Sequence, residues 1–308
     1  MGRLSKAVDR ITAGRRAKAT IRAYDSDWRH FNAWCNSAGK EPLPAKAATV
    51  ALYLADVLET MRVGTAERRV AAIRHKHLEQ QLTTPTDDRQ VSALLIGARR
   101  EQGTRVAGKD AITPEQLRAM ISKQPNTDIG VRNKAILLFG FASAMRRSEL
   151  AALDVDDLDI LTKGVRVQIG RSKTDQEGKG RIIGVFRSAK ARSCPVAALE
   201  KWIAIRGHKN GPLFINLSAN ATKTKARKRL GDRSIWKVVK DAAESIGLDA
   251  SRYAPHSLRS GCITAAIEGG TAESIIMKLS GHKSLASVAR YVRPATIWKH
   301  NPLLKALG

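Results

Sequence analysis

Three motifs in the second half of the chain contain side chains suited to chemistry on a phosphate ester. Residues Met145–Leu150 contain Arg146 and Glu149, residues 256–259 read His-Ser-Leu-Arg, and Gly281-His282 precedes Tyr291 by nine residues. A guanidinium group can bind two phosphate oxygens at once. Imidazole exchanges protons near neutral pH, and a phenol that loses its proton becomes a nucleophile. Together these side chains could bind a phosphate group, remove a proton from the phenol and attack the phosphorus.

The spacing of the motifs decides whether these side chains can meet. His256 and Arg259 are three residues apart and share one face of a helix. Nine residues at about 100° each would place His282 and Tyr291 on opposite sides of a continuous helix. Gly281 can end one helix and Ser284 can begin the next, so we predict a break that lets both side chains reach one site.

Each motif has an ordinary structural alternative. An Arg-x-x-Glu pair on a helix is usually a surface ion pair, and His-x-x-Arg occurs by chance in basic proteins. A lone tyrosine near the end of a chain is normally a core residue. The individual motifs are therefore weak, and their combination and order carry the argument.

Other kinds of site are poorly supported by the sequence. No glycine-rich phosphate loop ending in Gly-Lys-Ser/Thr is present, which argues against an ATP motor. His75 and His77 point apart on a helix and are expected to be solvated or to face DNA. Four aspartates in the segment 154–159 could bind Mg²⁺, or could form a polar turn after a helix, which we favour. We expect neither a metal nor another cofactor.

Charge is the informative feature of the composition. The 308 residues include 54 Lys plus Arg against 28 Asp plus Glu, a formal net charge of +26. Such an excess usually serves a polyanion, with nucleic acid first and an anionic membrane surface second. No apolar run is long enough to span a bilayer. The scattered Cys35, Cys194 and Cys262 favour a reducing cytoplasm over a disulfide framework.

The first hundred residues have a helical pattern. One apolar stripe runs along a first helix, from Ile21 to Trp34. A second helix around 50–57 follows Pro42 and Pro44. A third follows Gly64-Thr65, with its buried side at Val70, Ile73 and Leu78, and a fourth covers roughly 88–99. We therefore predict an all-helical domain over 1–105 and a linker at about 101–112, where apolar periodicity is lost.

The remaining residues, 113–308, are predicted to form a larger, mostly helical domain. Thr113-Pro114-Glu115 has the pattern of an N-cap followed by a new helix. An apolar helix is expected at about 131–145. The runs 165–169 and 181–185 resemble two strands of a hairpin or small sheet. From Pro195 onward the pattern is mainly helical, so the fold class is mainly α with a small sheet.

The order of the motifs resembles the catalytic domain of the tyrosine recombinases, a family that includes Cre, the Xer proteins and phage integrases. The matching positions are Arg146, Lys173 in the hairpin, His256 with Arg259, His282 and Tyr291. The segment from Thr20 to Trp34 with the following Pro-Leu-Pro-Ala resembles the helical, SAM-like core-binding domain of Cre-like members. The chain departs from the family at Ala144-Met145, where Gly-Leu is common, and at Arg147, where an apolar residue is common.

The resemblance implies a site-specific recombinase that cuts and rejoins DNA through a 3′-phosphotyrosine, for integration, excision or resolution in mobile elements. Tyr291 would be the nucleophile and His256 its proton acceptor. Arg146 and Arg259 would stabilise charge on the non-bridging oxygens. Lys173 would be the general acid for the 5′ oxygen, His282 would bind the phosphate or orient the site, and Glu149 would support Arg146.

The basic residues predict where double-stranded DNA is held. The candidates are spread over both domains: Arg22, Arg68, Arg69, Lys223, Lys225, Arg227, Lys228, Arg229 and Arg233. A basic loop that leads into a helix N-terminus is a natural phosphate contact, and a solvated surface is the alternative. The resemblance further implies a homotetramer on two DNA sites, joined through the apolar C-terminal tail, in the cytoplasm. The tail could instead pack on its own domain.

Two other classes of function remain open from the sequence. A non-catalytic DNA-binding relative would keep the fold, although the intact motif residues argue against it. A type IB topoisomerase or a telomere resolvase would share the nucleophile and the arginines. Accumulation of Holliday junctions from two-site substrates distinguishes recombination from relaxation.

Overall fold

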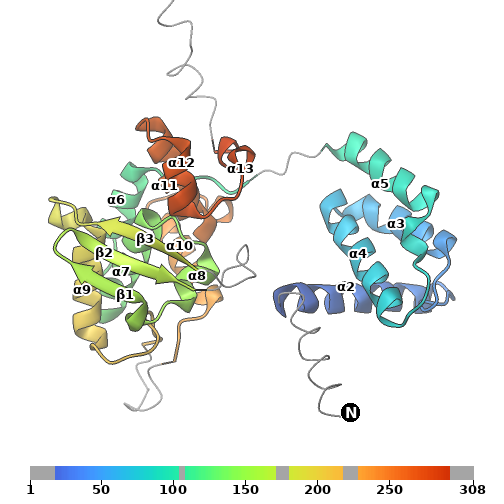
Figure 1. The fold of residues 1–308 in the computed structure, drawn as a ribbon, viewed down its shortest axis with the longest axis horizontal. Coiled ribbons are helices and arrows are strands. Elements are labelled where there is room, and N and C mark those ends of the chain that lie inside the picture. Colours follow the sequence, from blue (N-terminus) through green and yellow to red (C-terminus); the bar gives the residue numbers. More distant parts are fainter. Residues whose placement is uncertain (1–17, 104–107, 171–179, 218–227, 292–308) are drawn as a thin grey trace, which may run out of the picture. The chain divides into compact units, whose positions relative to one another are not determined.

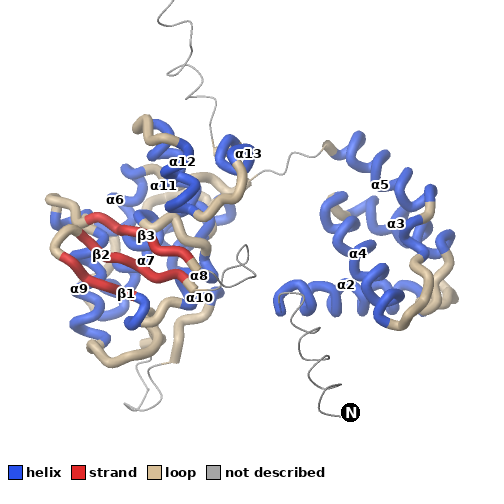
Figure 2. The backbone as a smooth tube through the Cα atoms, in the orientation of Figure 1, coloured by secondary structure: helices blue, strands red, loops and turns tan. Residues whose placement is uncertain are grey.

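A computed structural model of the chain describes residues 18–103, 108–170, 180–217 and 228–291 (Figure 1). The chain divides into two compact units, residues 1–107 and 108–308. In the described part of the first unit every element is helical (Figure 2). Its helices are α2 (Lys18–Ser37), α3 (Ala47–Thr60), α4 (Val63–Glu79), the 3-10 helix η1 (Pro85–Asp87) and α5 (Arg89–Gln102).

The four predicted helices of this unit are confirmed. Helix α2 packs on α4, and α3 packs on α5. An aromatic cluster fills the centre, with the rings of Phe31 and Tyr53 5.0 Å apart. Asp88 caps α5 by accepting the Gln90 N–H at 2.7 Å. Because α5 runs to Gln102, it includes the first residues of the segment predicted as a linker.

Two details of helix α4 were predicted wrongly. Leu78 was placed on the buried side but is 52% exposed. His77 was expected to be solvated or to face DNA but is fully buried. Its Nε2 accepts the Ala45 N–H at 2.9 Å, and its Nδ1 lies 2.9 Å from the Ile73 carbonyl, so the ring serves as a polar core residue.

The second unit contains a small sheet and most of the helices. The helices are α6 (Pro114–Ser122), α7 (Asp128–Ala142), α8 (Arg147–Ala152), α9 (Pro195–Arg206), α10 (Asp232–Glu244), α11 (Pro255–Glu268), α12 (Glu273–Ser280) and α13 (Leu285–Ala289). The strands are β1 (Leu158–Leu161), β2 (Gly164–Ile169) and β3 (Arg181–Phe186), and the 3-10 helices are η2 (Val155–Asp157), η3 (Ala191–Ser193) and η4 (Ala250–Arg252). Thr113 caps α6 as predicted, with its side chain accepting the Gln116 N–H at 3.2 Å.

The sheet is antiparallel with the order β1-β2-β3. Val167 pairs with Ile183, and Val165 pairs with Val185, and these side chains form the buried face. The two predicted strands are confirmed, and β1 was missed. Of the aspartates before it, Asp156 and Asp157 lie in η2, and Asp154 binds Arg229 at 2.5 Å.

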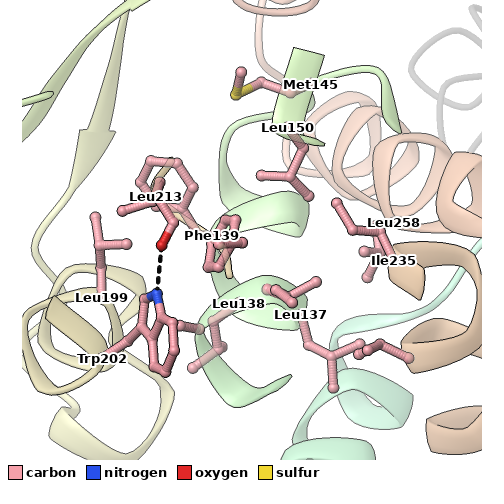
Figure 3. Packing of buried hydrophobic residues seen from close by; sticks show 14 of the residues in the cluster. Leu137, Leu138, Phe139, Met145, Leu150, Leu199, Trp202, Leu213, Ile235 and Leu258 are labelled. Carbon is pink, nitrogen blue, oxygen red and sulfur yellow. Dashed lines mark hydrogen bonds between the residues drawn. The ribbon is translucent and has the colours of Figure 1, made fainter. Parts of the chain in front are cut away.

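Helix α7 is the central element of this unit. It packs on α9, α11, α10, α6 and β3, and it is buried over most of its circumference (Figure 3). Trp202 of α9 fills the core beside it and donates its indole N–H to the Leu213 carbonyl at 2.8 Å. A Cβ on Gly140 would lie 3.1 Å from both Leu150 of α8 and Leu258 of α11. This close approach brings two site-bearing helices against α7.

Candidate active site

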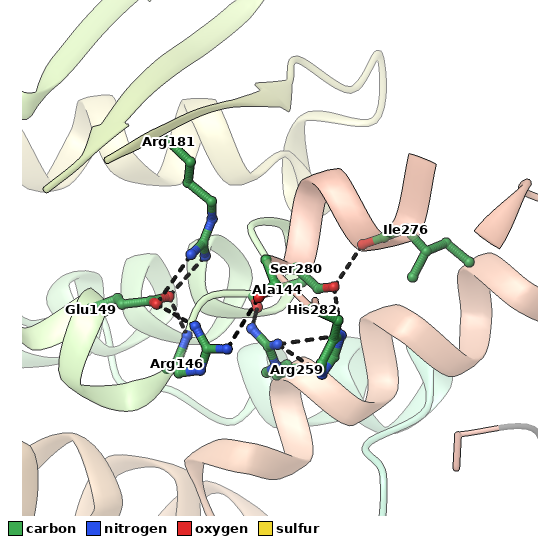
Figure 4. Close-up of polar contacts among 9 residues, drawn as sticks. Ala144, Arg146, Glu149, Arg181, Arg259, Ile276, Ser280 and His282 are labelled. Carbon is green, nitrogen blue, oxygen red and sulfur yellow. Dashed lines mark hydrogen bonds and ion pairs between the residues drawn. The ribbon is translucent and has the colours of Figure 1, made fainter. Parts of the chain in front are cut away.

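A cluster of basic side chains lies where α8, α11 and the turn after α12 meet (Figure 4). The predicted residues Arg146, Arg259, His256, His282 and Tyr291 all contribute to it, through contacts given below. Lys173 lies outside the described residues, so its position remains a prediction.

The turn between α7 and α8 places Arg146. Ser143 caps α7, and Ala144 then adopts a left-handed conformation with φ +48°, which reverses the chain. Arg146 is the N-cap of α8, and its N–H donates to Glu149 Oε2 at 2.9 Å. Its guanidinium donates to Glu149 Oε1 at 2.7 Å and to the Gly281 carbonyl at 3.3 Å. Glu149 therefore holds Arg146 through both its backbone and its side chain.

Arg146 and Arg147 make different contacts. The Arg147 guanidinium lies away from the cluster in an exposed ion pair with Asp232 at 3.2 Å. Arg146, by contrast, is directed at the turn that carries His282. The family-based alignment of Arg146 thus agrees with the geometry.

Helix α11 supplies His256 and Arg259 from one face, as the spacing predicted. Arg259 is 1% exposed, and its guanidinium donates to the Ala144 carbonyl at 2.7 Å. It also lies 3.0 Å from His282 Nε2. Burial and the charge of Arg146 lower the pKa of Arg259 below its ordinary value, but a guanidinium stays cationic in a protein.

The predicted break between His282 and Tyr291 is confirmed. Gly281 ends α12 in the left-handed region with φ +69°, and Ser284 is the N-cap of α13. The phenol oxygen of Tyr291 lies 3.2 Å from His256 Nε2. The Tyr291 ring centroid is 5.6 Å from that of His282. The break therefore brings both side chains to one site.

The surroundings of both histidines favour the neutral imidazole. Desolvation, followed by the charges of Arg259 and Arg146, lowers the pKa of His256. The same causes lower the pKa of His282 to about 4. Neutral His256 can therefore present the lone pair of Nε2 to the Tyr291 hydroxyl, which is the arrangement of a general base and the group it deprotonates.

One further site residue, Arg181 of β3, was not identified from the sequence. Its guanidinium donates to Glu149 Oε2 at 2.9 Å and to Oε1 at 3.2 Å. A Cβ on Gly281 would lie 2.6 Å from the Arg181 guanidinium and would displace it, and the φ of +69° also favours glycine there. Burial would raise the pKa of Glu149, but hydrogen bonds from Arg181 and Arg146 lower it overall, so Glu149 is ionised. The sequence signal was a single arginine at the start of a strand, which is not distinctive.

Two of the predicted DNA contacts have partners within the protein, and one of them, Arg69, is buried. Arg69 is 7% exposed and donates to the Tyr53 hydroxyl at 3.0 Å inside the first unit. Arg229 donates to the carbonyls of Ala151, Ala152 and Leu153 at the end of α8, and it pairs with Asp154. Both guanidinium groups hold protein together, and an unpaired buried carbonyl or carboxylate would be costly.

The other predicted DNA contacts divide into exposed residues and residues outside the described ranges. Arg22, Lys228 and Arg233 are exposed. Arg68 is half-exposed, and it pairs with the buried Asp27 at 2.7 Å. Lys223, Lys225 and Arg227 lie outside the described residues. Within the described ranges, no group of three or more His, Cys, Asp or Glu side chains could hold a metal ion, and no helix could cross a membrane.

Comparison with known proteins gives a consistent family assignment. The family model described as "Phage integrase family" matches residues 110–296. An integrase/recombinase xerD homolog of Selenomonas ruminantium is 34% identical over 305 residues, which cover 98% of this chain and 89% of that protein. Tyrosine recombinase XerD of Caulobacter vibrioides is 27% identical, over 91% of this chain and 87% of that protein.

Solved structures share the fold. A lambda integrase fragment, crystallised as a dimer bound to a COC′ core site, aligns with a TM-score of 0.60 at 17% identity over 94% of both chains. XerH bound to a palindromic difH substrate aligns with a TM-score of 0.59 at 15% identity, over 85% of this chain and 71% of that chain. At these identities the likeness establishes the fold alone.

Proposed function

The chain belongs to the phage integrase family, the tyrosine recombinases, and we propose that it breaks and rejoins DNA through Tyr291. Its relatives identify it as an enzyme of site-specific recombination. The observation that carries the assignment of roles is the 3.2 Å approach of the Tyr291 hydroxyl to His256 Nε2, beside two arginines. This contact joins a nucleophile to a proton acceptor.

In the proposed first step, the Tyr291 oxygen attacks the phosphorus and its proton passes to His256 Nε2. The bond from phosphorus to the 5′ oxygen breaks as the new bond forms. Arg146 and Arg259 stabilise the extra negative charge on the non-bridging oxygens. The products are a 3′-phosphotyrosine and a 5′ hydroxyl, whose proton we assign to Lys173 on the strength of the family resemblance.

Rejoining reverses this step with the 5′ hydroxyl of another strand. The covalent link conserves the energy of the phosphodiester, so the proposed chemistry needs neither ATP nor a metal ion. Glu149 supports the reaction indirectly, because it fixes Arg146 through two hydrogen bonds.

We assign DNA binding to both units, with residues 1–107 as the core-binding domain and 108–308 as the catalytic domain. The exposed Arg22, Arg68, Lys228 and Arg233 are the described candidates for phosphate contacts. Arg233 supports this best, since it is exposed at the start of α10 in a surface hollow lined also by Trp236 and by the Arg147–Asp232 ion pair. We further propose a homotetramer joined by the C-terminal tail, and action in the cytoplasm, which three free cysteines favour.

The test uses a duplex selected from a random-sequence library by binding to the full-length protein. A nick placed near the cleavage position traps the covalent complex, which is then detected on a denaturing gel. Wild-type protein should form the adduct, and Tyr291→Phe should form none while binding the duplex within about threefold, because affinity comes from many phosphate contacts. An adduct with the Phe variant would refute the assignment. Holliday junctions from two-site substrates would establish strand exchange.

A further inference from the structure

Ser280, the last residue of α12, is fully buried and makes two short hydrogen bonds (Figure 4). Its Oγ lies 2.6 Å from the Ile276 carbonyl oxygen and 2.7 Å from His282 Nδ1. A carbonyl oxygen can only accept, so the hydroxyl proton must point at Ile276. The lone pairs of the Ser280 oxygen then face His282 Nδ1, which must carry a proton.

Arg259 packs against the same ring. One nitrogen of its guanidinium lies 3.0 Å from His282 Nε2 and 3.5 Å from Nδ1. Two such similar distances place this nitrogen over the ring and not in line with the Nε2 lone pair. The Ser280 hydroxyl therefore assigns the proton of the neutral ring to Nδ1, and Nε2 is left unprotonated.

The surroundings keep the ring in this neutral form. After burial, the largest effects on His282 come from Arg259, Arg146, His256 and Arg181, and each of them lowers its pKa. A second proton on Nε2 is therefore disfavoured near pH 7.

We propose that Ser280 fixes His282 as the Nδ1–H tautomer and so holds the ring in place against the Arg259 guanidinium. Ser280 and His282 are then positioning residues that act through Arg259. In this tautomer Nε2 cannot donate to a phosphate. Of the two roles expected for His282, orientation of the site is the one that the hydrogen bonds support.

The test is a measurement of the ring nitrogens in the full-length protein, labelled with ¹⁵N-histidine, at pH 7.5. The chain has seven histidines, and the His282 signals are assigned by their loss in His282→Gln. Nδ1 should carry the proton and Nε2 should not. A proton on Nε2 of the wild-type protein would overturn the proposal without any need for a variant at position 280.

Two serine variants then separate hydrogen bonding from packing. Ser280→Ala should lower the ratio of Nδ1–H to Nε2–H by about two- to tenfold, the range that one neutral hydrogen bond supplies. Ser143→Ala is the matched control, because Ser143 is equally buried and its Oγ has no hydrogen-bond partner among the residues that the structure describes. An unchanged ratio in Ser280→Ala, or an equal change in Ser143→Ala, would show that the hydroxyl does not set the tautomer.

The kinetic consequence rests on the proposed function. Under single-turnover conditions, Ser280→Ala should cleave the selected duplex more slowly by about the same two- to tenfold factor. Its dissociation constant for that duplex should be unchanged. Normal cleavage by Ser280→Ala with an altered tautomer would refute the role of His282 in holding Arg259. If the wild-type protein cleaves nothing, the proposed function fails, and the tautomer measurement still decides the assignment of the proton.

Discussion

Replacing Arg181 with methionine removes one of the two guanidinium groups that bind the Glu149 carboxylate. The side chain of Glu149 is 1% exposed and that of Arg181 is 18% exposed, so the pair is shielded from water. Methionine fills a similar volume beside Gly281 without the charge. Glu149 keeps its bonds to Arg146, from the guanidinium at 2.7 Å and from the backbone N–H at 2.9 Å.

These contacts set the expected magnitude. Loss of one partner from a fully buried ion pair destabilises a protein by about 3–5 kcal/mol. Hydrogen bonds to a charged group contribute about 1.5–3 kcal/mol each. Because Arg146 still neutralises Glu149, we expect Arg181→Met to lower the free energy of unfolding of the second unit by about 2–3 kcal/mol. A shifted Arg146 should also slow cleavage by about ten- to a hundredfold, as small displacements of a catalytic group do.

Arg187 offers a matched control. It makes a bidentate pair with Glu200 at 2.6 and 2.9 Å, but both side chains are about one-third exposed. Such surface pairs contribute about 0–1 kcal/mol, so Arg187→Met should change little in stability or cleavage. Urea unfolding of both variants, of Glu149→Gln and of the Arg181→Met/Glu149→Gln double variant gives the coupling energy. A coupling below about 0.5 kcal/mol, or equal losses in Arg181→Met and Arg187→Met, would refute the reasoning.

Three other predictions follow from the site. Ala144→Val should destabilise the second unit by about 2 kcal/mol or more, because a β-branched residue does not tolerate φ +48°. Ala144→Gly should change the free energy of unfolding by no more than about 1 kcal/mol, and equal destabilisation of both variants on urea unfolding would contradict this reasoning. The folded-state pKa of His282, about 4, lies below its unfolded value. Its contribution to the free energy of unfolding is therefore complete above about pH 6.5 and declines as the pH falls toward 4. The free energy of unfolding should therefore depend less steeply on pH in this window for His282→Asn than for the wild-type protein. The remaining slope is due partly to His256, and identical slopes would exclude a contribution from His282. A bridging 5′-phosphorothiolate substrate should restore cleavage to Lys173→Ala but not to Arg146→Ala, and rescue of both or of neither would show that the roles are assigned wrongly.

The sequence predicted best those elements whose ends carry their own chemical signal. Thr113 followed by proline starts α6 where expected, and Gly281 ends α12 where expected. The signals act locally, through a capping hydroxyl and through a left-handed turn, so no knowledge of tertiary contacts is needed. Strand β1 has no such signal. It is four residues long and largely exposed, so the two-residue period of a half-buried strand is absent.

Basic residues were harder to interpret, because charge alone does not show whether a guanidinium faces solvent or protein. Arg69 and Arg229 have the same side chain as Arg22, yet Arg69 lies inside the helical unit and Arg229 caps α8. The carbonyls and the aspartate that Arg229 binds precede it in sequence by 75 to 78 residues. Such partners are fixed by the tertiary fold, so they cannot be predicted from a run of basic residues.

The same limit separates the residues that would touch DNA from those that would position them. Tyr291 and His256 can be recognised by their chemistry and order, because the reaction requires those types. Arg181 and Ser280 act through Glu149 and His282, so any suitable donor at the right place would serve. Only the distances reveal that Arg181 reaches Glu149 at 2.9 Å and that Ser280 reaches His282 at 2.7 Å. Variants of these two residues therefore test the geometry of the site independently of the motif that identifies the family.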